Sequence, residues 1–267
     1  MPAVEPLEDA DLAGELALLV EAAREAGRIA MRYFRRDPEV WLKGGTSPVS
    51  EADYAADSYL RETLLAARAG YGWLSEETAD DAARLGMRRT FIVDPIDGTR
   101  GFLDGRSEWC VSAAVVEGGR SIAAVLECPA RGETYSATLG GGAFKNGARL
   151  AVGETRASPL VGGPVTMVGA LPKPMRASVR RSPYIPSLAY RIGLVADGTL
   201  DATFIKPNSR DWDLAAADLI LHEAGGRILD VQGMAPTYGA WDTLHGAMVC
   251  GSGALLEAMA KTIRAGD

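Results

Sequence analysis

The sequence predicts a layered α/β protein made of two subdomains. Three features support this fold class: apolar residues recur at helical spacing near the N-terminus, strand-like runs with glycine turns fill the middle, and helix-like and strand-like segments alternate in the last third. Chains with this mixture bury their apolar faces by packing helices against sheets. From about Pro159 the composition shifts toward glycine and proline, so the predicted subdomains are residues 1–157 and 158–267.

Two helices are expected before the first strand. The first has apolar residues at steps of three and four and should end near Asp37-Pro38. Its apolar residues are Leu12, Leu16, Leu19, Val20, Ala23, Ile29, Ala30 and Phe34. After a Gly-Thr-Ser-Pro loop, residues 51–69 again have helical composition and lead toward Trp73-Leu74.

Strands dominate the middle of the chain. Residues 90–93 are β-branched or aromatic and end at Asp94, so they predict a strand that carries DPIDGT at its C-terminal end, where open α/β sheets hold their sites. Residues 111–116 and 122–127, separated by EGGR, predict a hairpin. Residues 133–144 continue the strands, with Gly-Gly-Gly as a turn.

The last third alternates between strands and a helix. Residues 188–196 and 202–205 are expected to be strands. Residues 213–223 predict a helix that ends at Gly225-Gly226, and residues 227–231 predict another strand.

Composition restricts the possible partners. A formal charge of −7 and a pI near 5.1 argue against a nucleic-acid polymer as ligand, because polyanion binding needs a surplus of Lys and Arg. An acidic N-terminus without an apolar segment indicates no secretory signal, and no apolar run approaches a membrane span, so a cytoplasmic location is expected. The three cysteines are widely spaced and odd in number, which favours buried thiols over disulfides or a metal site.

Acidic residues gather at the predicted ends of elements. Glu76 and Glu77 follow Trp73-Leu74-Ser75, Asp94 and Asp97 flank a proline, and Asp213 begins a helix. Hard oxygen ligands of this kind suit Mg²⁺, which assists phosphate ester hydrolysis.

DPIDGT by itself is compatible with other structures and chemistries. A tight Asp-Pro and Asp-Gly turn would explain it without any function. A haloacid-dehalogenase-type phosphatase would form a phosphoaspartate, but its two acidic residues are two positions apart, whereas Asp94 and Asp97 are three apart. The spacing therefore disfavours the covalent mechanism.

Three motifs in order resemble the inositol monophosphatase superfamily of Mg²⁺-dependent, lithium-sensitive phosphomonoesterases. They are WLSEET at 73–78, FIVDPIDGTRGF at 91–102 and WDLAAADLILHEAGG at 212–226, and KGGTSPVSEAD at 43–53 is a weaker fourth. The resemblance covers roughly residues 12–260. It implies a five-layer αβαβα sandwich of the inositol monophosphatase and fructose-1,6-bisphosphatase type, commonly a homodimer, with two or three Mg²⁺ ions.

The resemblance also implies residue roles. Direct attack by metal-activated water on a phosphate ester, without a phosphoenzyme, is expected. The implied metal ligands are Glu76, Asp94, the Ile96 carbonyl, Asp97 and Asp213. Glu76 and Thr99 would polarise the water with support from Asp53, and Gly98, Thr99 and Arg100 would hold the phosphate at a helix N-terminus.

The substrate is less constrained than the metal site. Three kinds of substrate are considered: adenosine 3′,5′-bisphosphate and its sulfated relative, inositol monophosphate, and histidinol phosphate. Trp212 stands where the histidinol phosphate branch usually has tyrosine, and Lys206 stands where the inositol branch places a carboxylate. A cation at that position favours a second negative group on the substrate and hence the bisphosphate nucleotidase-like branch, although Gly101 departs from the glutamate usual there.

A basic segment offers a further candidate contact. Residues 173–191 contain Lys173, Arg176, Arg180, Arg181 and Arg191 and no acidic residue. Arg180 and Arg181 are predicted to bind the second phosphate or the base, with a solvated helix face as the alternative. A protein of the same fold that binds a phosphorylated ligand without turnover is the non-enzyme alternative, which the complete set of metal-site residues disfavours.

Overall fold

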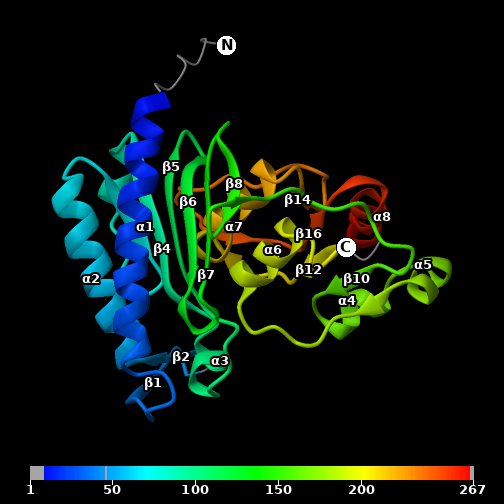
Figure 1. Cartoon of the computed structure of the whole chain (residues 1–267), viewed down its shortest axis with the longest axis horizontal. Helices are drawn as coiled ribbons and strands as arrows, with labels where there is room; N and C mark the ends of the chain where they lie inside the picture. Colours follow the sequence, from blue (N-terminus) through cyan, green and yellow to red (C-terminus); the bar gives the residue numbers. More distant parts are fainter. Residues whose placement is uncertain (1–8, 46, 265–267) are drawn as a thin grey trace.

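The computed structural model describes residues 9–45 and 47–264 and has five layers (Figure 1). Two helices cover one face of a seven-stranded sheet, two more helices separate this sheet from a five-stranded sheet, and further helices cover the outer face of the second sheet. This order confirms the predicted αβαβα sandwich. Most of the N-terminal segment used to predict the absence of a secretory signal lies outside the described residues.

The seven-stranded sheet has the order β3-β4-β5-β6-β7-β8-β9, with β3 parallel to β4 and the other neighbours antiparallel. Its strands are β3 Gly72–Ser75, β4 Arg89–Asp97, β5 Cys110–Glu117, β6 Arg120–Cys128, β7 Glu133–Thr138, β8 Gly142–Lys145 and β9 Ala148–Arg149. The hairpin expected around EGGR is therefore confirmed as β5-β6.

The five-stranded sheet has the order β11-β10-β12-β16-β14, with β10 parallel to β11 and β12. Its strands are β10 Leu160–Gly162, β11 Arg180–Arg181, β12 Ala202–Ile205, β14 Arg227–Asp230 and β16 Met248–Gly251. Two small ribbons pair β1 Val40–Lys43 with β2 Ser47–Ser50, and β13 Ser209–Arg210 with β15 Leu244–His245.

Helices fill the other three layers. The outer pair is α1 Asp9–Met31 and α2 Glu51–Ala67, and the central pair is α6 Leu188–Ala196 and α7 Asp211–Glu223. The remaining helical segments are η1 Ala82–Gly86, α3 Thr99–Leu103, η2 Pro129–Arg131, α4 Val165–Gly169, α5 Lys173–Ser178 and α8 Gly253–Arg264. No helix in the described ranges has the length and apolarity needed to span a membrane.

The side chains of β4 alternate between two hydrophobic cores. Phe91 and Val93 pack with α1 and α2, while Ile92 packs with the central helices. Because side chains alternate along a strand, Asp94 lies on the same face of β4 as Ile92. Its carboxylate therefore points toward α7 and not toward α1 and α2. The strand is longer than expected: it runs to Asp97, with a register shift between Asp94 and Asp97. Pro95 is tolerated there because a bulge does not require its missing N–H.

The predicted strand at residues 188–196 is wrong, because this segment is helix α6. Its sequence, LAYRIGLVA, is apolar on nearly every face since it lies between two sheets, and such a run has no periodicity that separates helix from strand. Ser187 caps the helix, and its hydroxyl accepts a hydrogen bond from the Tyr190 amide at 2.9 Å.

The other elements lie close to their predicted positions. The first helix ends at Met31, six residues before the expected Asp37. All three cysteines are buried and free, as expected. Residue 158 falls between the last strand of the first sheet and the first strand of the second. The largest hydrophobic core includes residues of both sheets, and the division into two subdomains stays a prediction.

Candidate active site

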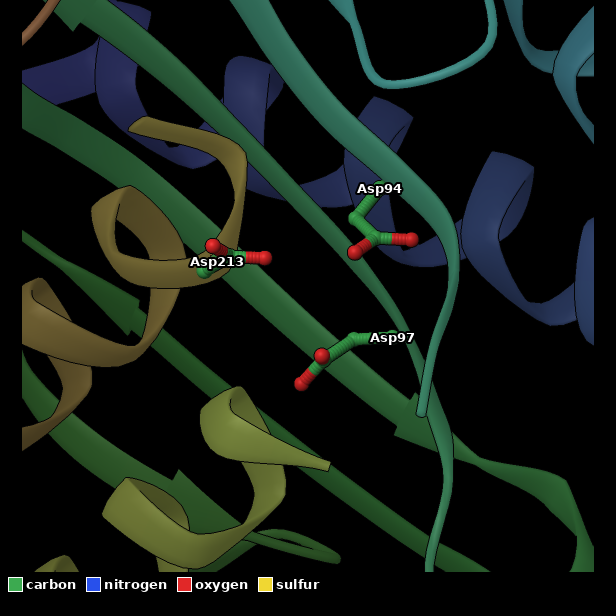
Figure 2. Close-up of side chains that lie close together, drawn as sticks. All are labelled: Asp94, Asp97 and Asp213. Atoms are coloured by element: carbon green, nitrogen blue, oxygen red, sulfur yellow. The ribbon is translucent and has the colours of Figure 1, made fainter. Parts of the chain in front are cut away.

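Three carboxylates meet where β4 ends and α7 begins. Asp94 and Asp97 come from β4 and Asp213 from the first turn of α7, and one carboxylate oxygen of each lies within 4.8 Å of the others (Figure 2). The bulge in β4 lets two aspartates three positions apart approach the same point. The segments that meet here are more than 110 residues apart in sequence, so the cluster is a product of the tertiary fold.

Each carboxylate is oriented through one of its oxygens. Asp94 Oδ1 accepts from the Ile96 amide at 3.0 Å, and Asp213 Oδ2 accepts from the Arg210 amide at 2.7 Å. Asp97 Oδ2 accepts from both the Ser187 hydroxyl and the Ala189 amide at 2.6 Å. These hydrogen bonds fix the orientation of each carboxylate.

Burial and mutual repulsion perturb these acids. Burial, followed by the charge of Asp97, raises the pKa of Asp213 to about 8, and burial raises the pKa of Asp97 to about 6 despite the Ser187 hydrogen bond. Burial also raises the pKa of Asp94, with Glu76, Asp97 and Asp213 adding repulsion. A cation bound among these carboxylates would reverse these shifts in pKa.

The donor set fits a hard divalent cation. Its members offer only oxygen atoms, the ligand type that Mg²⁺ prefers, and their geometry is held by backbone amides before any ion binds. Glu76 lies next to the cluster because it follows β3, the neighbour of β4, and its amide donates to the Val93 carbonyl at 3.3 Å.

Glu76 is engaged by a lysine from the β1-β2 ribbon. Lys43 Nζ lies 2.9 Å from Glu76 Oε1 and 2.8 Å from Glu77 Oε1. Burial lowers the pKa of Lys43, but the two glutamates outweigh this effect and raise it overall. Burial raises the pKa of Glu77 to about 7 although Lys43 opposes the shift. Lys43 thus supplies part of the positive charge that the acidic site requires.

Thr99 is held by Asp53. Thr99 Oγ1 lies 3.2 Å from Asp53 Oδ1 and 3.1 Å from the Ile96 carbonyl oxygen. Asp53 is fixed in turn, because its Oδ2 accepts from the amide and hydroxyl of Ser50 at 2.8 and 2.6 Å in a capping box at the start of α2. An ionised carboxylate and a carbonyl only accept, so the Thr99 hydroxyl must donate to one of them and its oxygen can accept from a third group.

One cleft of about 200 Å³ is lined by Glu76, Asp94, Asp97, Thr99 and Asp213. Its other lining residues include Ser47, Pro48, Gly98, Arg100, Tyr184, Pro186 and Lys206. Gly98 has a φ of 95°, and a Cβ there would lie 3.0 Å from the Ser187 amide nitrogen, so glycine allows the start of α3 to approach α6. A Cβ at Gly101 would lie 2.6 Å from the ring of Pro186, which explains why a glutamate does not fit at this position.

The structure brings together most of the residues expected from sequence. Glu76, Asp94, Asp97, Thr99 and Asp213 line the cleft with Gly98, Arg100 and Lys206, while Asp53 and the Ile96 carbonyl contact Thr99. Arg180 and Arg181 instead form β11, an exposed edge strand of the second sheet, and they are not among the residues that line the cleft.

Several contacts were not anticipated. Ser187 and the Ala189 amide hold Asp97, Lys43 binds Glu76, and Tyr184 lines the cleft. Ser187 could have been found as a helix cap if residues 188–196 had been recognised as helical. Lys43 lies within the weak fourth motif, whereas no local pattern marks Tyr184.

A comparison with known proteins agrees with this geometry. The model of the inositol monophosphatase family matches residues 11–266, nearly the whole chain. The chain belongs to the inositol monophosphatase family. As a member, it is a phosphoric monoester hydrolase.

Similar proteins carry different substrate names. The chain is 34% identical to an inositol-1-monophosphatase of Rhizobium meliloti, with 93% of this chain and 96% of that protein covered. It is 29% identical to the 3′(2′),5′-bisphosphate nucleotidase CysQ of Aggregatibacter actinomycetemcomitans, with 82% and 86% covered. Among solved structures, the Thermotoga maritima IMPase superposes with a TM-score of 0.82 at 26% identity, over 94% of this chain and 97% of that one.

Proposed function

We propose that this protein hydrolyses a small phosphorylated metabolite with Mg²⁺, and that its preferred substrate is adenosine 3′,5′-bisphosphate. The observation that carries the hydrolytic part is the approach of Asp94, Asp97 and Asp213 to within 4.8 Å in a polar cleft that also contains Thr99. A protein that only bound a phosphorylated ligand would have no need of a hydroxyl oriented by Asp53 next to these acids.

The proposed metal ligands are carboxylates and one carbonyl. Glu76, Asp94, Asp97, Asp213 and the Ile96 carbonyl would hold the two or three ions that the family resemblance implies. When bound there, Mg²⁺ would act as a Lewis acid that lowers the pKa of water and stabilises negative charge on the phosphoryl oxygens.

Thr99 and Glu76 are proposed to position the attacking water. Because the Thr99 hydroxyl donates to Asp53 or to the Ile96 carbonyl, its oxygen accepts a hydrogen bond from the water. The Glu76 carboxylate accepts the other water proton once Lys43 moves from Oε1, and the backbone amides of residues 98–100 bind the phosphoryl oxygens. Attack is direct, without a phosphoaspartate.

The substrate proposal rests on a cation in the cleft. Lys206 lines the cleft and acts favourably on the charge of Asp213. A cation there suits a second phosphate on the substrate, whereas a ring hydroxyl would be held better by a carboxylate. The name of the Rhizobium relative supports inositol 1-phosphate as the second candidate, and histidinol phosphate is the third.

The test measures phosphate release with Mg²⁺ from adenosine 3′,5′-bisphosphate, myo-inositol 1-phosphate and histidinol phosphate, with Asp94→Asn as the blank. A higher kcat/KM for the bisphosphate supports the proposal. Preference for inositol phosphate would reject the substrate while keeping the phosphatase. No phosphate release from any of the three compounds would favour a ligand-binding protein. A phosphoaspartate trapped on Asp94 or Asp97 would reject the proposed direct attack by water.

Three further properties are proposed. Inhibition by lithium and assembly as a homodimer rest on the family resemblance, and a cytoplasmic location rests on the sequence features described above. Enzyme assays with LiCl and sedimentation measurements would test the first two.

A further inference from the structure

Asp57 is a buried carboxylate whose two oxygens are both bound to hydroxyl groups near Glu76. It lies on α2 and contacts the end of β3 and the segment after it. Its Oδ1 accepts from the Ser75 hydroxyl, and its Oδ2 accepts from the Thr78 hydroxyl at 2.6 Å. Ser75 and Thr78 stand on either side of Glu76 and Glu77 in sequence, so one carboxylate holds both ends of this short acidic segment.

The acidic segment itself lies outside regular secondary structure. β3 ends at Ser75, and residues 76–78 form a bend. The Glu76 amide still bonds to β4, and the Glu77 amide donates to the Ser75 hydroxyl at 3.3 Å. The same hydroxyl therefore joins the backbone of the bend to Asp57. Because a bend lacks the repeated hydrogen bonds of a strand, its position depends more strongly on such side-chain contacts.

A carboxylate is a costly way to join α2 to this segment. A buried charge needs hydrogen bonds to compensate for lost hydration, whereas an apolar side chain would pack between helix and sheet without that cost. Hydrogen bonds, however, fix both a distance and a direction, which apolar contacts do not. Asp57 is therefore suited to hold the segment in one geometry, beyond any contribution to packing.

Asp53 lies one turn before Asp57 on α2 and is bonded to Thr99. Its Oδ1 lies 3.2 Å from Thr99 Oγ1. Residues four positions apart share a helix face, so the two aspartates project from the same side of α2. Thr99 and Glu76 are the groups proposed to position the attacking water. Each is connected to α2 through one of these carboxylates, and the helix thereby relates their positions to each other.

We propose that Asp57 is a positioning residue for Glu76 and acts through the hydroxyls of Ser75 and Thr78. The inference rests on the proposed phosphatase function, and it adds to that function residues that do not line the cleft. Misplacing a reacting group by about 1 Å can lower a rate by about 10²-fold. Loosening the segment should therefore lower kcat more than it changes KM.

The experiment compares the wild type with Asp57→Ala, Thr78→Val, Thr78→Ser and the double variant Asp57→Ala/Thr78→Val. It measures kcat and KM for whichever of the three test compounds the wild type hydrolyses fastest, and calorimetry without substrate gives the dissociation constant of Mg²⁺. We expect kcat to fall about tenfold or more in Asp57→Ala and less in Thr78→Val, with KM within about threefold of wild type and weaker binding of Mg²⁺. Thr78→Ser should recover most of the kcat. The double variant should be no slower than Asp57→Ala, because both changes break the same link.

Tyr238→Phe is the matched control for Thr78→Val. It also removes one hydroxyl from a helix aspartate, because Tyr238 Oη donates to Asp218 Oδ2 of α7 at 3.0 Å. Neither Tyr238 nor Asp218 lines the cleft. Denaturant unfolding is measured for every variant. We expect both Thr78→Val and Tyr238→Phe to lose stability and only Thr78→Val to lose kcat.

The outcomes separate this inference from the proposed function. If Asp57→Ala and Thr78→Val lose stability but keep kcat and the Mg²⁺ dissociation constant within about threefold of wild type, the inference is overturned while the phosphatase stands. If Asp57→Ala does not fold, Thr78→Val and Thr78→Ser decide. If the wild type hydrolyses none of the compounds, the proposed function fails and calorimetry decides: weaker Mg²⁺ binding by Thr78→Val supports the positioning of Glu76, and equal dissociation constants reject it.

Discussion

Thr99→Val should separate the positioning of water from the binding of metal and phosphate. Valine keeps the β-branched shape and removes the hydroxyl that lies 3.2 Å from Asp53 Oδ1 and 3.1 Å from the Ile96 carbonyl. If this oxygen positions the attacking water, its loss should lower kcat by about 10²- to 10⁴-fold, the usual contribution of one placed proton-transfer or hydrogen-bonding group. KM should change little, because the backbone amides that hold the phosphate are retained.

The same substitution has a predictable effect on stability. Asp53 is buried, and its Oδ1 would lose the Thr99 donor while Oδ2 keeps both bonds from Ser50. Leaving one buried acceptor unpaired costs about 1–3 kcal/mol of unfolding free energy. Denaturant unfolding without metal measures this loss independently of activity.

Thr99→Ser is the matched control, since it restores the hydroxyl on a smaller side chain. It should recover most of the kcat that Thr99→Val loses. Steady-state phosphate release at saturating Mg²⁺ is the assay. A Thr99→Val enzyme with kcat within about threefold of wild type would refute the proposed role of the hydroxyl, whatever its stability.

Two other predictions concern the acidic cluster. The folded carboxyls of Asp97 and Asp213 have pKa values of about 6 and about 8, above the ordinary 3.8, so the folded state binds protons more tightly than the unfolded state. Metal-free protein should therefore gain stability as the pH falls from about 8 toward about 4, and saturating Mg²⁺ should weaken this dependence. Thermal melting at several pH values, with EDTA or with Mg²⁺, measures the effect. A metal-free Tm that falls between pH 8 and 6 would contradict the prediction. Ser187→Ala removes both the cap of α6 and a donor to Asp97, so we expect a loss of about 1 kcal/mol in stability together with a lower kcat. Ser187→Thr, which keeps the hydroxyl, should retain both properties, and equal activity of the alanine variant would show that the Ala189 amide alone orients Asp97.

Sequence patterns predicted correctly those helices and strands that bury one face and expose the other. The first helix has one apolar face against the sheet, so its spacing was informative. Residues 188–196 are enclosed by both sheets, and burial on all sides removes the periodicity that would have marked a helix. DPIDGT was expected to follow its strand, whereas most of it continues β4 through a bulge that depends on pairing with β5.

Not every residue of the cleft could be anticipated. The acidic residues lie in motifs that are informative one at a time, and Lys206 was expected from its place before one of them, whereas Tyr184 lines the cleft without any local pattern. Arg180 and Arg181 were expected to contact the substrate because they lie in a basic segment. In the structure they form an exposed edge strand and do not line the cleft.

The sequence by itself determined the family, the layered fold and the acidic residues that meet in the cleft, because these depend on residue types at short, recurrent spacings. Only the tertiary structure decided which oxygen of each carboxylate is held by the protein and that Lys43 contacts Glu76. These features depend on contacts between segments far apart in the chain, and the free energy of such contacts comes from burial and directional hydrogen bonding that no local pattern records.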